Sequence, residues 1–358
     1  MRKTLNRKTR LLMFIGLAML LTYMIPLRQA SAQGSYTGQW LLESKPGSNL
    51  LYLKLSYGTA TDGNSATSFN VALEQLQGLT QARLTAAKAP VKLKLSRDAG
   101  TFDCAGEFGE AKGSGDFTYT ANPGFAAELK KRGFEVPTAD QQFSLALHDV
   151  GLTMIEHLQK SGYKRPSINQ LVSLGTHGVN LEYLKGLEAE GYNLESVDLV
   201  IRTQDHGVTP DYIKRVKALG YSNLSIDELI GATDHGVTPD FIAGIKSSGY
   251  DPIALDELIR AKDHGISRDF IKAMKAIGYN DVPLDELIRA KDHGVSPNLI
   301  KEYNLLGYEN LSLDQLIRMR SHEVTAAFIR EARARGFNNL TIEQLINLRI
   351  NGPEKQPH

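Results

Sequence analysis

One stretch of the sequence, HGVTPDYIKRVKALGYSNLSIDELIGATD at residues 206–234, carries the pattern that decides the fold. Its histidine recurs every 29 residues, and each histidine is followed two residues later by valine or isoleucine. The recurring histidines are His148, His177, His206, His235, His264, His293 and His322. A fixed period of this length is the signature of stacked repeats, in which each unit buries its apolar face against its neighbours.

Each repeat is expected to form two short helices of about ten residues. In the quoted stretch, Thr209 is a preferred N-cap and Pro210 fits the first helical position. Gly220 can end this helix in the left-handed conformation. Ser225 and Glu228 have the spacing of a capping box that starts the second helix. Helices this short are marginal alone in water, so the sequence predicts an α-solenoid of two-helix repeats.

The period extends the predicted solenoid over residues 119–351, which is about eight repeats. Tyr119 occupies the histidine position before the first repeat, and Asn351 occupies it one period after the last histidine. Different residues are expected at both ends, because terminal repeats cap the array. Residues 352–358 are expected to be a C-terminal tail.

Residues 33–118 have the period of strands instead. Leu51, Leu53 and Leu55 alternate with Tyr52, Lys54 and Ser56, which is typical of strands with one buried face. We expect five or six antiparallel strands, a hairpin at residues 97–100 and a helical turn around residues 73–79. Cys104 lies on the apolar face of its strand, so a buried, inert thiol is expected. The predicted fold class is therefore α+β, with a small antiparallel β-domain followed by the α-solenoid.

The N-terminus has the features of a secretory signal peptide. Five positive charges lie in the first ten residues, an uncharged run covers residues 11–27, and Ala30-Ser31-Ala32 fits a cleavage site. We expect cleavage after residue 32 and export to the periplasm or the medium. In the alternative, residues 11–27 stay as an inner-membrane anchor, which would be the protein's only contact with a membrane. The net charge of +1 argues against nucleic acid as a partner.

The repeated histidine has two interpretations. One is a metal-binding or pH-sensing array; the other is a helix cap, in which the imidazole donates to free carbonyls at the helix end. Equivalent atoms of adjacent repeats lie roughly 8–10 Å apart, whereas zinc ligands lie about 2 Å from one ion. Neighbouring histidines therefore cannot share a metal, and we expect all seven to be structural caps. A cationic imidazole also suits the negative helix end, which predicts greater stability at acid pH.

Basic residues recur eight and eleven residues after the histidines, and acidic pairs open the second helices. The basic positions form a candidate interaction stripe for an acidic partner or an anionic envelope polymer. The alternative is a solvated face whose salt bridges each contribute little. The stripe comprises Lys214, Lys217, Lys246, Lys272, Lys275, Lys301, Arg330 and Arg333.

The sequence contains no nucleophile elbow, no phosphate-binding glycine loop before a helix and no pair of cysteines. The string at residues 321–325 is not a zinc-protease motif, because its second histidine is absent. We therefore predict no catalytic residues, no metal, no cofactor and no enzymatic activity.

Three motifs carry a family resemblance. His-Gly-Val-Thr-Pro, Leu-Gly-Tyr and Leu-Ser-Ile-Asp-Glu-Leu-Ile together resemble a helical repeat of exported bacterial proteins. Similar repeats look to be attached outside the membrane to penicillin-sensing antirepressor metallopeptidases and anti-sigma-type regulators. Residues 113–123 look like the strand that precedes such repeats. This chain lacks the metallopeptidase's zinc motif, so the resemblance implies an extracytoplasmic sensing or docking module and no peptidase.

These patterns predict a non-catalytic interaction scaffold in the bacterial cell envelope, with another envelope protein as its partner. One alternative is an extracytoplasmic sensor that binds a small ligand or a cell-wall fragment through the β-domain, where the single tryptophan, Trp40, lies. A further alternative is a hydrolase with a site at the domain junction.

Overall fold

A computed structural model describes residues 35–45, 47–59 and 63–352. The predicted signal peptide, the alternative anchor at residues 11–27 and residues 353–358 of the tail lie outside the described residues. The chain divides into two compact units. Among the described residues, the β-unit comprises those up to Ser96 together with Gly100–Ala121, and the helical unit comprises Arg97–Ala99 and those from Asn122 onward. Among the described residues, no helix has the length and apolar character needed to cross a membrane.

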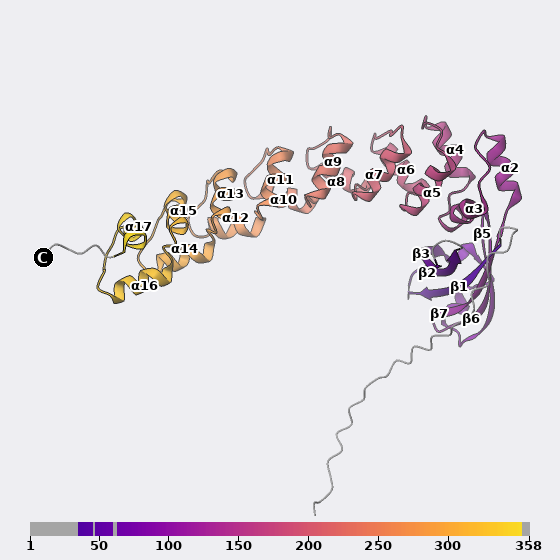
Figure 1. Ribbon diagram of the computed structural model, residues 1–358, viewed down its shortest axis with the longest axis horizontal. Coiled ribbons are helices and arrows are strands. Elements are labelled where there is room, and N and C mark those ends of the chain that lie inside the picture. The colour runs from indigo at the N-terminus through magenta and orange to yellow at the C-terminus, as the bar shows by residue number, and fades with distance from the viewer. Residues whose placement is uncertain (1–34, 46, 60–62, 353–358) are drawn as a thin grey trace, which may run out of the picture. The chain divides into compact units, whose positions relative to one another are not determined.

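The β-unit is a seven-stranded sheet in the order β3-β2-β1-β7-β6-β5-β4 (Figure 1). The sheet has more strands than the five or six expected, because the short β4 adds a seventh. Helix α1 (Gln81–Thr85) was not predicted. The turn expected near residue 73 is a 3-10 helix, Leu73–Gln75, that leads into β4. The strands are β1 (Ser35–Ser44), β2 (Leu50–Thr59), β3 (Gly63–Ala72), β4 (Leu76–Gln77), β5 (Ala89–Arg97), β6 (Gly100–Gly109) and β7 (Lys112–Ala121).

The alternating pattern places one face of the sheet in a core. Trp40 is only 1% exposed, and its indole N–H donates to the carbonyl of Ala105 at 3.2 Å. The indole reaches across Gly115 and Gly106, which face each other in the β6–β7 register. A Cβ on Gly115 would lie 2.0 Å from the Ala105 oxygen, so this close approach requires glycine. The single tryptophan is therefore a core residue of the β-unit.

Cys104 is buried in the same core, as predicted. Burial, together with the neighbouring Asp103 carboxylate, raises the pKa of its thiol to about 12. A thiol held in the protonated form is a poor nucleophile, so Cys104 acts as a packing residue.

The helical unit contains sixteen described helices of 8–10 residues. Both the even-numbered and the odd-numbered helices begin at intervals of 29 residues. The first helices of the pairs are α2 (Pro123–Lys131), α4 (Leu152–Lys160), α6 (Leu181–Ala189), α8 (Pro210–Ala218), α10 (Pro239–Ser247), α12 (Arg268–Lys275), α14 (Pro297–Asn304) and α16 (Ala326–Ala334). The second helices are α3 (Ala139–Leu147), α5 (Ile168–Thr176), α7 (Val197–Asp205), α9 (Ile226–Asp234), α11 (Leu255–Asp263), α13 (Leu284–Asp292), α15 (Leu313–Ser321) and α17 (Ile342–Asn351).

Helices of the same parity lie next to one another. Among the even-numbered helices, each helix from α6 to α12 contacts the next one in the set. Among the odd-numbered helices, α5 contacts both α3 and α7, and α15 contacts both α13 and α17. The helical unit therefore has two rows of helices, which succeed one another in chain order (Figure 1).

Local capping chemistry explains where the helices begin and end. The Thr209 hydroxyl accepts from the backbone N–H of Tyr212, and Ser225 forms the predicted capping box with Glu228. Gly220 ends α8 with a φ of 101°, which only glycine adopts readily. These three predictions are confirmed.

The start of the helical unit differs from the prediction. Tyr119 lies in β7, paired with Tyr36 of β1 and Phe102 of β6, and is not at a helix end. Strand β7 continues to Ala121, so the first helix begins at Pro123, and the boundary lies three residues later than predicted. At the other end Asn351 is the last residue of α17, and Gly352 caps it with a φ of 73°.

Candidate functional site

The structure places all seven repeated histidines at the C-cap position of an odd-numbered helix, α3 through α15, where the backbone N–H of each bonds to a helix carbonyl. The imidazole has a different role from the one predicted. In four repeats its Nδ1 contacts the aspartate that lies 28 residues later, at the end of the next odd-numbered helix. The pairs are His177–Asp205 at 2.7 Å, His206–Asp234 at 2.6 Å, His235–Asp263 at 2.8 Å and His264–Asp292 at 2.7 Å. The side chain thus joins two repeats.

The first histidine behaves differently from these four. His148 is half-buried, and Gly175 packs so closely on it that an added Cβ would lie 2.6 Å from the His148 Cβ. Burial lowers the pKa of His148. For this residue the predicted gain of stability at acid pH is wrong in sign, because desolvation disfavours the charged ring. Among the described residues, no cluster of three or more histidine, cysteine, aspartate or glutamate side chains could hold a metal.

A tyrosine ladder joins the repeats at a second place. In five of the six Gly-Tyr pairs, the tyrosine donates its hydroxyl to a backbone carbonyl 32 residues later, in the next repeat. The bonds are Tyr192 to Leu224, Tyr221 to Ile253, Tyr250 to Val282, Tyr279 to Leu311 and Tyr308 to Leu340, at 2.5–2.8 Å. Tyr163 is the exception, because its buried hydroxyl has no partner among the described residues.

Half of the predicted interaction stripe is used inside the structure. The residues eleven positions after the histidines reach back to the last carbonyls of the preceding even-numbered helix, as Lys246 does to Leu219 at 2.7 Å and Lys275 to Ser248 at 2.8 Å. Lys217 and Arg333 bond to Glu190 and Leu306 in the same way. Lys246 also lies 5.5 Å from the ring centre of Tyr221, a cation–π distance. These four residues of the predicted stripe therefore cap helix ends.

The other half of the stripe is free. Lys214, Lys272, Lys301 and Arg330, eight positions after their histidines, are exposed and form no hydrogen bond or ion pair with any described residue. Lys185 holds the same position on α6, is also exposed, and was missed by the sequence analysis although it has the same 29-residue register. We call these five residues, Lys185, Lys214, Lys272, Lys301 and Arg330, the basic row. Ala243 interrupts the row on α10.

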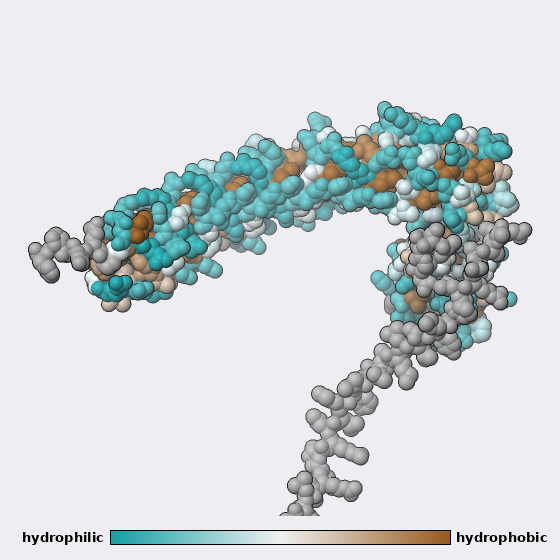
Figure 2. All heavy atoms as spheres, in the orientation of Figure 1, coloured by the Kyte–Doolittle hydropathy of each residue, from teal (hydrophilic) through white to brown (hydrophobic). Residues whose placement is uncertain are grey.

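The odd-numbered helices carry charges that neutralise one another. The acidic residues that open these helices meet arginines 25 residues earlier, in the preceding odd-numbered helix. The pairs are Arg202–Asp227, Arg260–Asp285, Arg289–Asp314 and Arg318–Glu343. Each such exposed pair contributes little to stability, but it leaves no basic group available at that position. Hydrophilic residues cover most of the visible face of the helical unit (Figure 2), and the basic row supplies its free cations on the even-numbered helices.

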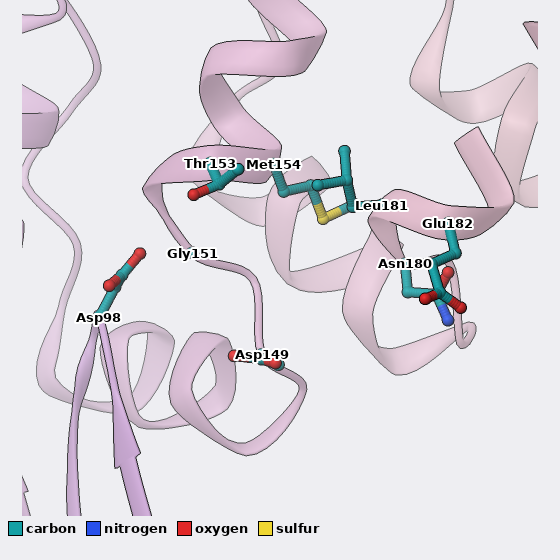
Figure 3. A pocket seen from close by; sticks show the side chains of 8 residues that line it. All are labelled: Asp98, Asp149, Gly151, Thr153, Met154, Asn180, Leu181 and Glu182. Atoms are coloured by element: carbon teal, nitrogen blue, oxygen red, sulfur yellow. The ribbon is translucent and has the colours of Figure 1, made fainter. Parts of the chain in front are cut away.

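A pocket of about 370 Å³ lies near the start of the helical unit (Figure 3). Two of its three acidic groups have structural partners. The Asp98 carboxylate accepts from the backbone N–H of Leu152 at 2.7 Å and so caps α4, whose own N-cap residue is Gly151. Asp149 pairs with Arg97. The lining residues are Asp98, Asp149, Gly151, Thr153, Met154, Asn180, Leu181 and Glu182. They include no histidine or cysteine, so this pocket lacks a nucleophile paired with a histidine base.

The arrangement as a whole is therefore built for holding repeats together and for presenting a charged surface. Two ladders and a set of capping cations join neighbouring repeats, and the basic row is left facing solvent. Comparison with protein-family models, with curated proteins and with solved structures finds no match for this chain, so the resemblance to exported repeat proteins stays a prediction.

Proposed function

We propose that the helical unit is an α-solenoid that serves as a non-catalytic docking scaffold for another protein of the bacterial cell envelope. Support for the solenoid comes from the constant 29-residue spacing of both helix rows and from bonds that join each repeat to its neighbours. Stacked repeats of this kind present an extended surface on which equivalent side chains recur at regular intervals. Such a surface suits a partner that contacts several repeats at once.

The observation that carries the proposal is the difference between the two rows of helices. On the odd-numbered helices, Arg202, Arg260, Arg289 and Arg318 are paired with acids of the next repeat, and Lys262 and Lys291 lie over aromatic rings. On the even-numbered helices, five of six successive repeats from α6 to α16 present a basic side chain that is exposed and free. A partner with acidic groups can bind such side chains without first breaking an existing ion pair. Charges of this type steer association and favour a partner of opposite charge.

The proposed location rests on the N-terminal sequence. A basic head, an apolar run and a small-residue cleavage site would export the chain, so both units would meet their partner outside the cytoplasm. The resemblance to repeats attached to extracytoplasmic regulators agrees with this location.

The test is chemical crosslinking in the native envelope, followed by purification of the tagged protein. One variant changes all five residues of the basic row to glutamate. The matched control changes five exposed lysines outside the row to glutamate, namely Lys54, Lys88, Lys92, Lys130 and Lys164. Both variants alter the net charge equally, so a difference between them reports on position and not on total charge.

We expect the wild-type protein and the control variant to capture the same envelope protein, and the row variant to lose most of it. Circular dichroism should show equal helix content in all three proteins, because the changed side chains are exposed. Equal capture by the row variant and the control would exclude the basic row as the docking surface. Failure of the wild-type protein to capture any partner would reject the scaffold function.

A further inference from the structure

The basic row is not uniform along the helical unit. In α6, α8 and α12 an acidic residue lies three positions before the basic one, on the same helix face. These pairs are Glu182 and Lys185, Asp211 and Lys214, and Asp269 and Lys272. In α14 and α16 the corresponding residues are Asn298 and Ala327, which are uncharged. Lys301 and Arg330, at the C-terminal end of the row, therefore lack the acid that precedes the other members, although Glu302 and Glu331 follow them directly.

An exposed apolar side chain lies at the same end. Leu305, the C-cap residue of α14, is 87% exposed, the highest value among the exposed large hydrophobic residues of the described chain. The equivalent position is small in five other repeats: Ala189, Ala218, Ser247, Ala276 and Ala334. The packing between repeats therefore does not require a large side chain at the position of Leu305. A leucine on the surface of a helix gains free energy when another molecule covers it.

Leu305 and the two free cations belong to one surface. Leu305 follows Lys301 by four residues, and its backbone N–H bonds to the Lys301 carbonyl at 3.0 Å, so both occupy the same face of α14. Helix α16 is joined to the end of α14 by the bond from Arg333 to the Leu306 carbonyl. Arg330 lies one turn before Arg333. We call Lys301, Leu305 and Arg330 the C-terminal patch.

We propose that the C-terminal patch is where the partner is anchored, and that it binds an acidic segment of a protein that carries one aliphatic or aromatic side chain. This inference rests on the proposed docking function and names the chemistry of the partner. The acidic groups pair with Lys301 and Arg330, and the apolar side chain packs on Leu305. A single apolar contact surrounded by charges has the anatomy of a protein interface, in which a central anchor is enclosed by a polar rim.

The charges around the patch favour a protein over a uniformly anionic surface. Glu302 follows Lys301 and Glu331 follows Arg330, and both glutamates are exposed. A bilayer of acidic lipids or a polyanionic polysaccharide would bring negative charge against these glutamates as well as against the cations. A folded or extended polypeptide can place its acids only where the cations lie, so it avoids that repulsion.

The experiment introduces a photo-crosslinking amino acid into the full chain in its native envelope, in place of Ala334 or, in a second variant, of Ala218. Both positions are exposed and equivalent within their repeats, but only Ala334 adjoins the patch. The crosslinked product is digested and the attached peptide is sequenced. The Ala334 variant is also combined with Leu305→Ser and with Leu305→Met, which remove and retain the apolar contact.

We expect the Ala334 variant to capture a peptide rich in Asp and Glu with an aliphatic or aromatic residue among them. Leu305→Ser should lower the yield about tenfold, equivalent to about 1.4 kcal/mol, whereas Leu305→Met should retain it. A protein captured only from Ala218, a yield indifferent to Leu305→Ser, or a peptide without acids would each overturn this inference and leave the docking function standing. Capture of a lipid or a polysaccharide alone, or of nothing at either position, would overturn both.

Discussion

Removal of one hydroxyl from the tyrosine ladder gives the sharpest test of how the repeats are held together. Tyr250 donates to the Val282 carbonyl of the next repeat at 2.7 Å, and burial raises the pKa of its hydroxyl. Tyr250→Phe removes the bond and leaves that carbonyl without its donor. Since a typical hydrogen bond contributes about 0.5–1.5 kcal/mol and an unsatisfied buried acceptor adds to the loss, we expect the free energy of unfolding to fall by about 1–1.5 kcal/mol.

The chain contains its own control for this substitution. Tyr163 holds the same place in an earlier repeat and is 7% exposed, but its buried hydroxyl has no partner among the described residues. Tyr163→Phe therefore removes a desolvated polar group and breaks no bond. The free energy of unfolding should change by less than about 0.5 kcal/mol or should rise.

Urea unfolding followed by far-UV circular dichroism measures both changes. Amide hydrogen exchange in helices α10 to α13 should be recorded beside it, because repeat arrays can unfold in parts and one global value then misses a local loss. We expect faster exchange in this segment for Tyr250→Phe only. Equal losses for the two variants, or a larger loss for Tyr163→Phe, would refute the conclusion that these hydrogen bonds hold adjacent repeats together.

Three further predictions concern single positions. Gly231→Ala should raise the thermal midpoint by the equivalent of about 0.5–1 kcal/mol, because nothing lies within 4 Å of the added Cβ. Gly175→Ala should lower the thermal midpoint, because its Cβ would lie 2.6 Å from the His148 Cβ. Lys246→Met should lower the free energy of unfolding in urea by about 1 kcal/mol through loss of a helix-end bond. Lys214→Met, at an exposed and free position, should change it by less than about 0.5 kcal/mol. Burial lowers the pKa of His148, so as the pH falls the unfolded chain takes up this proton before the folded chain does. The residue should therefore reduce stability as the pH falls below about 6.5. The free energy of unfolding, measured at pH 5 and pH 8, should depend less on pH in His148→Asn.

The sequence predicted the helices well because their signals are local. A capping threonine, a proline at the first position and a glycine at the end all act within one turn. The same signals recur in each repeat, so a wrongly predicted boundary of one helix does not affect the prediction of the next. The start of the array was harder to place. Tyr119 fits the 29-residue register and also the alternation of a strand, and pairing with β1 and β6 decides in favour of the strand.

The role of each repeated side chain was less predictable, because its partner lies in another repeat. The imidazole was expected to bond within its own helix end, but it meets an aspartate 28 residues later. The lysines eight and eleven residues after the histidine looked alike in sequence, yet Lys217 caps a helix end and Lys214 faces solvent. Their separation by one turn of helix, with one side chain directed at the preceding repeat, is a property of the packing and not of residue type.

The bonds that join the repeats have a consequence for how such a chain can change. The bonds of the histidine and tyrosine ladders span 28 and 32 residues respectively, so each of them connects only adjacent repeats. Duplication or loss of a whole 29-residue module would leave every remaining module with neighbours of the same kind. The helical unit could thus gain or lose repeats one at a time, without any need to redesign the contacts that keep it folded.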